Sequence, residues 1–297
     1  MWIALGLVSC FFLGLYDITK KVSLSNNAVI PVLFFASLTG ALIFVPFAFL
    51  SHWGILPEHS IFFVPSISLK AHGLLLMKST LVASTWFFAY YALKHLPITI
   101  VTPIRATGPI WTLIGALIIY KEQYSALQWI GMAIVLGFFY FFSLAGKHEG
   151  INFKRNIWIV FIMLATLLGS ISTLYDKYLI AHYDRMAVQT WFSIYLIPVF
   201  LPFMMFMWYP ERKKSKPFEW RWAIPLIGIL LTIGDFAYYF ALSDPDMLIT
   251  ILSVLRRTSV IISFTIGAII FKEINLKRKA FALFGIFVGV IIMVLGS

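Results

Sequence analysis

The stretch RATGPIWTLIGALIIYKE, at residues 105–122, recurs 151 positions later as RRTSVIISFTIGAIIFKE, at residues 256–273. The alignment places Arg105 opposite Arg256, and both copies end in Lys-Glu. Two shorter matches precede it: YYAL at 90–93 with YFAL at 239–242, and LYD at 15–17 with LYD at 174–176. This ordered duplication predicts two copies of one structural unit, over residues 1–146 and 151–297.

The composition places both copies in a lipid bilayer. Of the 297 residues, 61% are hydrophobic and 12% are charged, whereas soluble domains are about 45–50% apolar and about 25% charged. A soluble fold of this length cannot bury so much apolar surface. Disordered chains lack such hydrophobicity, and a disulfide scaffold needs more than the single cysteine present here. A polytopic membrane protein remains.

Ten apolar stretches are separated by turn residues or charges, and each is close to the length of about 20 residues that spans a bilayer. They cover residues 2–19, 28–50, 70–93, 97–119, 126–145, 157–179, 187–208, 222–242, 247–270 and 278–296. We expect helices, because a lipid-facing backbone must satisfy its own polar groups. Each copy holds five spans, an odd number, so the second copy is inverted in the membrane. The predicted fold is an all-α integral membrane protein with ten transmembrane helices in a 5+5 inverted-topology repeat, which is typical of secondary transporters.

Lysine and arginine are concentrated on one predicted side of the membrane. The side reached after odd-numbered spans holds 15 of them, the other side holds four, and four more lie within spans. Since positive residues favour the cytoplasm, we expect both termini to be non-cytoplasmic. We expect a multi-pass protein of the bacterial inner (plasma) membrane. The net charge of +11 is therefore mainly a topology signal and does not indicate nucleic-acid binding. The basic run at 212–216 is interpreted as a loop near anionic lipid.

Ionisable side chains inside the spans are the main candidates for function, because charge is costly in a bilayer. The cations are Lys78, Arg105, Arg256 and Arg257, and the carboxylates are Asp17, Asp176 and Asp235. In one interpretation the carboxylates pair with the arginines and hold the two halves together. In the other, a surplus of cations binds an anionic substrate. Both interpretations stay open. The three aspartates are also candidates for proton coupling.

Aromatic and proline residues supply weaker candidates. Four aromatic residues in the third span mirror four in the eighth, and the tyrosines Tyr90 and Tyr239 are the preferred substrate contacts among them. Pro103 and Pro109 are expected to loosen the fourth span, either as a tolerated kink or as part of a binding site. Glu122 and Glu273 end the fourth and ninth spans, and we interpret both as structural.

Several short motifs in order resemble a known family. The first half carries Tyr91-Ala92-Leu93-Lys94-His95-Leu96-Pro97, then Lys121-Glu122 and Trp129-Ile130-Gly131, and the second half carries Phe271-Lys272-Glu273 and Phe284-Gly285. These resemble EamA-type permeases of the drug/metabolite transporter superfamily, over nearly the whole chain. The resemblance implies secondary transport of metabolites, often export, through a central cavity lined mainly by helices 1, 3, 4, 6, 8 and 9. The chain departs from the pattern at 243–246, where SDPD replaces a Lys-containing turn, and at Arg256-Arg257.

The predicted function is a secondary active transporter (permease or exporter) of small metabolites that works by alternating access. The expected substrate is an organic anion or an amino-acid-like solute. Its expected partners are that substrate, membrane lipids, and a coupling proton or an exchanged solute. A lipid or lipid-carrier flippase is the alternative, and a passive channel is disfavoured by the dense buried charge. No Walker A loop, His-Glu-x-x-His or Gly-x-Ser-x-Gly motif is present, so we expect neither an enzyme nor a cofactor. The six histidines lack metal-ligand spacing.

Overall fold

The computed structural model describes residues 1–96, 101, 104–105, 107–146, 156–212, 217–271 and 276–296. Within these residues the regular secondary structure is entirely helical. The α-helices of the first half are α1 (Trp2–Leu24), α2 (Val29–His52), α3 (Leu69–His95), α5 (Gly108–Gly115) and α6 (Ala126–Gly146). Those of the second half are α7 (Ile157–His182), α8 (Arg185–Pro202), α9 (Ala223–Leu242), α10 (Ile249–Arg257), α11 (Ser259–Phe271) and α12 (Leu276–Leu295).

Among the described residues, five helices are long and apolar enough to cross a membrane: α1, α2, α7, α9, and α8 with its extension to Trp208. Shorter apolar segments lie at Gly108–Tyr120, Ala126–Phe138 and Phe284–Met293. The end of α5 continues as a π-helix, η1 (Ala116–Tyr120), and the end of α8 as η3 (Phe203–Trp208). The chain is therefore an α-helical, multi-pass membrane protein.

Two expected spans differ from the structure. The stretch 247–270 was expected to form one helix, but α10 ends at Arg257 and α11 begins at Ser259, with Thr258 between them. In the fourth span, Pro109 does not loosen a continuous helix. It stands in the first turn of α5, where its missing N–H costs no hydrogen bond. Pro97 and Pro103 lie outside the described residues.

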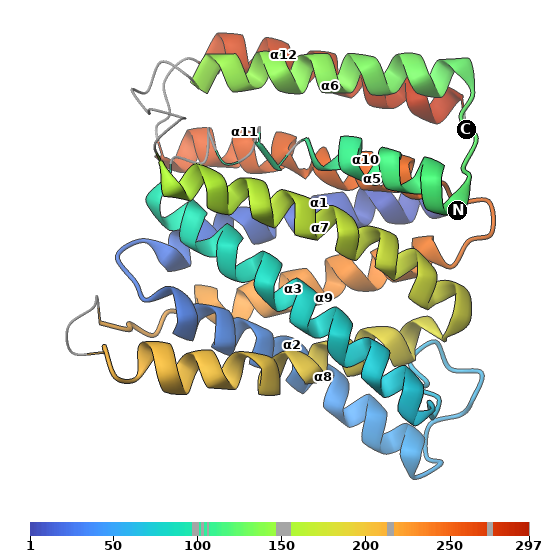
Figure 1. Cartoon of the computed structure of the whole chain (residues 1–297), viewed down its shortest axis with the longest axis vertical. Coiled ribbons are helices and arrows are strands. Elements are labelled where there is room, and N and C mark those ends of the chain that lie inside the picture. The colour runs from blue at the N-terminus through green and yellow to red at the C-terminus, as the bar shows by residue number, and fades with distance from the viewer. Residues whose placement is uncertain are drawn as a thin grey trace.

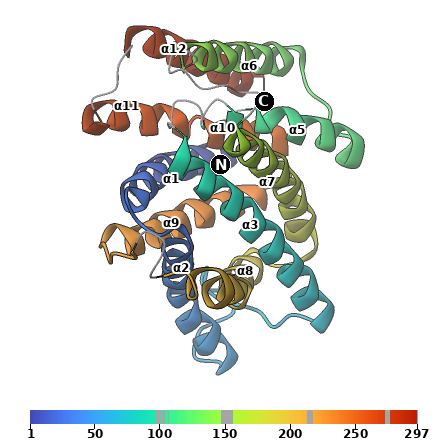
Figure 2. The ribbon, with the colours of Figure 1, turned by 60° about the vertical axis from the view of Figure 1, so that its left-hand side comes forward.

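Helices from the two halves pack against each other in exchanged pairs. Helix α1 packs on α9, as α7 packs on α3, and α2 packs on α9, as α8 packs on α3. Helix α2 also packs on α8, and α6 on α12. Figures 1 and 2 both place α6 and α12 together at one end of the molecule, with α2 and α8 together at the other. Each first-half helix thus has a second-half partner in the corresponding role.

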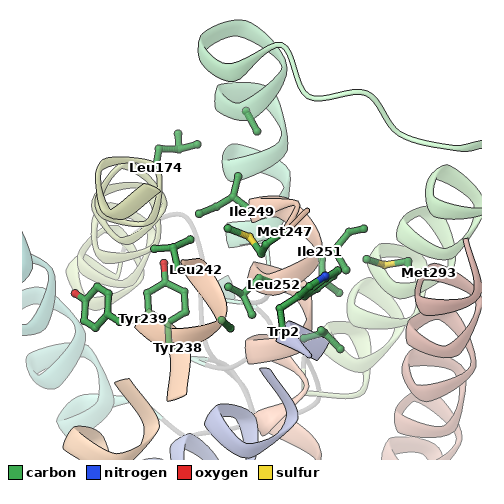
Figure 3. Packing of buried hydrophobic residues seen from close by; sticks show 14 of the residues in the cluster. Trp2, Leu174, Tyr238, Tyr239, Leu242, Met247, Ile249, Ile251, Leu252 and Met293 are labelled. Atoms are coloured by element: carbon green, nitrogen blue, oxygen red, sulfur yellow. The ribbon is translucent and has the colours of Figure 1, made fainter. Parts of the chain in front are cut away.

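The apolar core lies where the halves meet. One buried cluster joins Trp2 of α1, Leu174 of α7, Tyr238 and Tyr239 of α9, and Leu252 of α10 (Figure 3). It continues to Met293 of α12. Many large apolar side chains on the outside are exposed, as expected for surfaces that face lipid.

Glycines permit the close approach of α6 and α12. A Cβ on Gly131 would lie 2.4 Å from Met293 Cγ and 2.7 Å from the carbonyl oxygen of Gly289. A Cβ on Gly289 would in turn lie 2.9 Å from the carbonyl oxygen of Gly131. These separations are too short for any larger residue, so the backbones of the two helices meet at this pair.

Candidate functional site

A cavity of about 160 Å³ lies between the halves. Its lining comes from α1, α3, α7, α8, α9, α10 and α11, and from Arg105. Four cationic and three acidic side chains line it: Lys20, Lys78, Arg105, Arg256, Asp17, Asp176 and Asp235. Because every acidic group among them is within reach of a cation, the charged residues form pairs, with one cation in excess among the described residues.

The first charged group belongs to the first half. Asp17 Oδ1 accepts hydrogen bonds from Lys20 Nζ at 2.6 Å and from Arg105 Nη1 at 3.1 Å. The ammonium of Lys20 lies 4.3 Å from the centre of the Tyr16 ring and 5.2 Å from that of Tyr90. The two tyrosine hydroxyls are hydrogen-bonded to each other at 3.2 Å. Aromatic faces therefore help to hold a lysine that is only 2% exposed.

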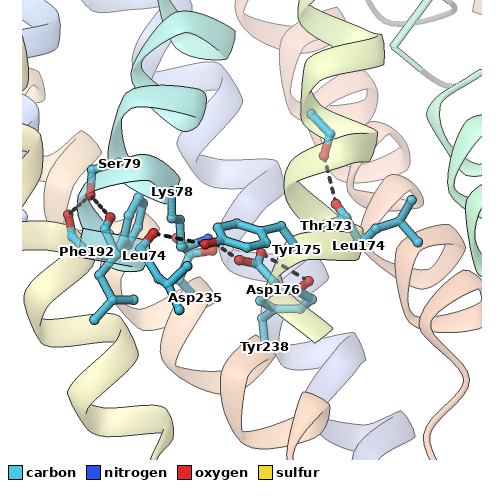
Figure 4. A network of polar contacts seen from close by, with 12 residues as sticks. Leu74, Lys78, Ser79, Thr173, Leu174, Tyr175, Asp176, Phe192, Asp235 and Tyr238 are labelled. Carbon is cyan, nitrogen blue, oxygen red and sulfur yellow. Dashed lines mark hydrogen bonds and ion pairs between the residues drawn. The ribbon is translucent and has the colours of Figure 1, made fainter. Parts of the chain in front are cut away.

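The second group crosses from one half to the other. Lys78 on α3 donates to Asp176 Oδ1 on α7, and the Tyr238 hydroxyl on α9 donates to Asp176 Oδ2 at 3.4 Å (Figure 4). The Lys78 ammonium also lies 4.5 Å from the centre of the Phe192 ring and 5.5 Å from that of Tyr239. The ion pair is thus enclosed by rings.

The third group belongs to the second half. Arg256 Nη2 donates to Asp235 Oδ1 at 2.5 Å, and its guanidinium carbon lies 3.9 Å from the centre of the Tyr238 ring. Tyr238 therefore touches both the second and the third group. Arg256 Nε is buried without a hydrogen-bond partner, which leaves one donor of this side chain unused.

The structure brings most of the predicted residues to this one cavity. Lys78, Tyr90, Arg105, Tyr239 and Arg256 all line it, as do Asp17, Asp176 and Asp235. The side chain of Arg257 lies outside the described residues. One expected pairing is wrong, because Asp176 pairs with a lysine and not with an arginine.

Three polar side chains in the charged groups were not among the predicted ones. Lys20 was counted as a loop charge beyond the first span, but α1 continues to Leu24 and buries it. Tyr16 precedes Asp17 in the repeated Leu-Tyr-Asp, and that repeat was the signal that could have identified it. Tyr238 was noticed only as part of an aromatic run, which does not distinguish it from Phe236 or Phe240.

Each helix interruption is bonded by the opposite half. Thr107 precedes α5, and Thr258, its repeat equivalent, separates α10 from α11. Cys10 Sγ on α1 is hydrogen-bonded to Thr258 Oγ1 at 3.1 Å. On the other side, Ser170 Oγ on α7 donates to the carbonyl oxygen of Gly108 at 2.9 Å. The arginines Arg105 and Arg256 each stand two residues before these interruptions.

A separate polar cluster joins the halves at one edge of the molecule. Glu122 accepts from Lys177 Nζ at 2.5 Å, from the backbone N–H of Ile249 at 3.1 Å, and from the Tyr124 hydroxyl. Tyr124 is also bonded to Thr250 Oγ1 at 2.6 Å. Burial, together with the Glu122 hydrogen bond, raises the pKa of Tyr124 above its usual range. Glu122 thus ties the start of α10 and the end of α7 to the first half.

Among the described residues, no three His, Cys, Asp or Glu side chains are grouped as metal ligands would be. The cavity offers ion pairs, tyrosine hydroxyls and aromatic faces. Such a lining suits reversible binding of a small charged solute.

Comparison with known proteins agrees with this architecture. One solved structure, titled only "Crystal structure of protein", matches with a TM-score of 0.72 at 12% sequence identity. The match covers 99% of this chain and 97% of that one, which shows a shared fold. A search of curated proteins finds no match. The EamA-like transporter family, however, matches twice, over residues 1–144 and 156–295. The chain therefore belongs to the EamA-like transporter family.

Proposed function

We propose that this membrane transporter moves a small metabolite by alternating access, as a secondary active permease or exporter. In this proposal ten transmembrane helices form two five-helix units, residues 1–146 and 151–297, with inverted topology. The chain lies in the bacterial inner (plasma) membrane with both termini outside the cytoplasm. Rocking of the units then exposes the cavity to each side in turn.

The exchanged helix pairs support the inverted arrangement. Swapping the halves converts the α1–α9 contact into the α7–α3 contact, and leaves the α2–α8 and α6–α12 contacts unchanged. In Figure 1, α1 starts at the edge where both termini lie, whereas its equivalent α7 ends there. Equivalent helices with opposite directions are what an inverted repeat requires.

The observation that carries the proposal is the charged cavity between the halves. At about 160 Å³, it is smaller than the roughly 300–1,000 Å³ of a pocket for a drug-sized ligand. Burying seven ionisable side chains inside a bilayer costs free energy, and such residues are rare unless they have a function. Binding of a charged solute is a function that requires them. We infer a substrate of metabolite size.

Charge favours an organic anion or an amino-acid-like solute. The described lining holds four cations and three carboxylates, so an anionic group restores neutrality in a low-dielectric site. Arg105 and Arg256 retain donors beyond those bonded to aspartate, and guanidinium groups suit bidentate binding of carboxylate or phosphate. The rings of Tyr90 and Tyr239 would contact the rest of the solute.

A thermal-shift screen of the purified protein against metabolites grouped by charge tests this function. Anionic or amino-acid-like compounds should raise the melting temperature, and Arg256→Gln or Arg105→Gln should reduce that rise while the protein still folds. A matched control is Arg221→Gln, which removes an exposed arginine bonded to Glu219 outside the cavity.

Other outcomes of the same screen discriminate between functions. Stabilisation only by cationic compounds would contradict an anion transporter. Stabilisation only by lipids would favour the alternative, a lipid or lipid-carrier flippase. Turnover of a compound by protein in detergent would indicate an enzyme. An undiminished rise in melting temperature in both arginine variants would also contradict the assignment of these residues to the substrate.

A further inference from the structure

The ion pair between Lys78 and Asp176 differs from the others in the cavity, because it joins the two halves. Asp17 pairs with Lys20 and Arg105 inside the first half, and Asp235 pairs with Arg256 inside the second. Among the described pairs of the cavity, only the Lys78–Asp176 contact runs between a first-half and a second-half helix. Movement of one half against the other must therefore break this pair and can leave the rest intact.

The pair also differs in the cation that holds the carboxylate. Arginine stays charged in proteins, whereas a buried lysine can exchange its proton. Asp17 and Asp235 each bond an arginine. Asp176 has a lysine in that position, and the two side chains are only 8% and 1% exposed. The ionic attraction between these two side chains is lost when the Asp176 carboxylate takes up a proton.

The surroundings limit which other groups respond to pH. Facing Asp176 are Lys78 from α3, the tyrosines Tyr238 and Tyr239 and the carboxylate Asp235 from α9, Arg256 from α10, and Tyr120 from η1. From α8 the cavity receives only the apolar ring of Phe192. Tyrosines keep their protons near neutral pH, and Asp235 is bonded to Arg256. Among these groups, Asp176 is the carboxylate whose ion pair joins the two halves.

We propose that Asp176 is the proton-binding site of this transporter and that the Lys78–Asp176 pair is a proton-operated latch between the halves. A proton from water adds to the Asp176 carboxylate and forms a neutral carboxylic acid, while Lys78 remains an ammonium. The ionic attraction between the halves is lost. The Lys78 charge is then available to the anionic group of the substrate, so proton binding favours anion binding. This proposal rests on the alternating access proposed above.

The test measures access to the cavity as a function of pH, in the full-length chain in proteoliposomes. A Thr85→Cys reporter on the cavity lining, in a Cys10→Ser background, is labelled from each side separately with a membrane-impermeant maleimide. Rates of labelling from the outside are divided by those of a His59→Cys surface reporter, which corrects for thiol ionisation. Lowering the pH should accelerate labelling by up to about tenfold per pH unit, the limit for a single proton.

The variants separate the latch from general effects of charge. Asp176→Asn should label fast at every pH. Lys78→Arg preserves the charge and should retain a closed latch to lower pH, with labelling about tenfold slower at the wild-type midpoint. Glu219→Gln, which alters a carboxylate paired with Arg221 outside the cavity, is the control and should keep the pH response.

Each contrary result has a distinct meaning. A wild-type pH response in Asp176→Asn, or its complete loss in Glu219→Gln, would overturn the latch. If Asp176→Asn does not fold, an unchanged midpoint in Lys78→Arg overturns it equally. Labelling from only one side at all pH values would instead contradict alternating access.

Discussion

At the residue scale, Lys20 shows how a buried charge can be misread. A hydropathy profile ends the first span before the first lysine, because an isolated ammonium is costly in the bilayer. The profile has no information about Asp17 one turn earlier on the same helix face, or about the rings of Tyr16 and Tyr90. By contrast, Arg105 and Arg256 were identifiable, since each interrupts a long apolar run and each recurs in the duplication.

We predict that Lys20→Met weakens binding of anionic compounds while leaving the fold intact, because Arg105 still neutralises Asp17. Loss of a charge-assisted hydrogen bond of about 1.5–3 kcal/mol corresponds to a tenfold to hundredfold rise in Kd. Titration of the stabilising anions by thermal shift measures this change.

The neighbouring Lys21→Met is the matched control. Lys21 donates to the carbonyl oxygens of Leu93 and Leu96 at the end of α3 and does not line the cavity. Equal weakening by both substitutions would show that general positive charge, and not the position of Lys20, attracts the anion.

At the element scale, hydropathy located the apolar helices but not their interruptions. The stretch 247–270 is predicted as one span, because a single threonine, Thr258, lowers the average hydropathy of the surrounding residues very little. At the interruption Thr258 is hydrogen-bonded to Cys10, 248 residues away in sequence, a contact that no local pattern can reveal. The π-helical ends η1 and η3 likewise follow apolar sequence without any local signal.

We predict that Gly131→Ala destabilises the α6–α12 pair. Its new methyl group would lie 2.4 Å from Met293 Cγ and 2.7 Å from a backbone oxygen, so the helices must separate. Overpacking of this kind costs about 1–3 kcal/mol. In α6 the exposed Gly137 has nothing within 4 Å of an added Cβ, so Gly137→Ala should be neutral or stabilise the helix. Denaturation of both variants in detergent measures the difference, and equal stabilities would contradict the close contact.

At the scale of the whole molecule, the duplicated sequence predicted which helices are equivalent, while charge counting predicted orientation. The burial of Lys20 removes one of the 15 basic residues counted on the cytoplasmic side, but the remaining imbalance still favours that side. What sequence could not supply is the pairing of charges across the halves. Asp176 and Lys78 are 98 residues apart, and their contact depends on how α3 packs against α7.

The predicted orientation has a direct test in intact cells that express the Cys10→Ser background. A cysteine at Ser215, in the basic run 212–216, should react with an impermeant maleimide only after the membrane is opened. A cysteine at His59, in the connection between α2 and α3, should react from outside, because this loop lies at the edge of the molecule that holds both termini (Figure 1). The reverse pattern would place both termini in the cytoplasm. The labelling therefore fixes the orientation of the chain in the membrane.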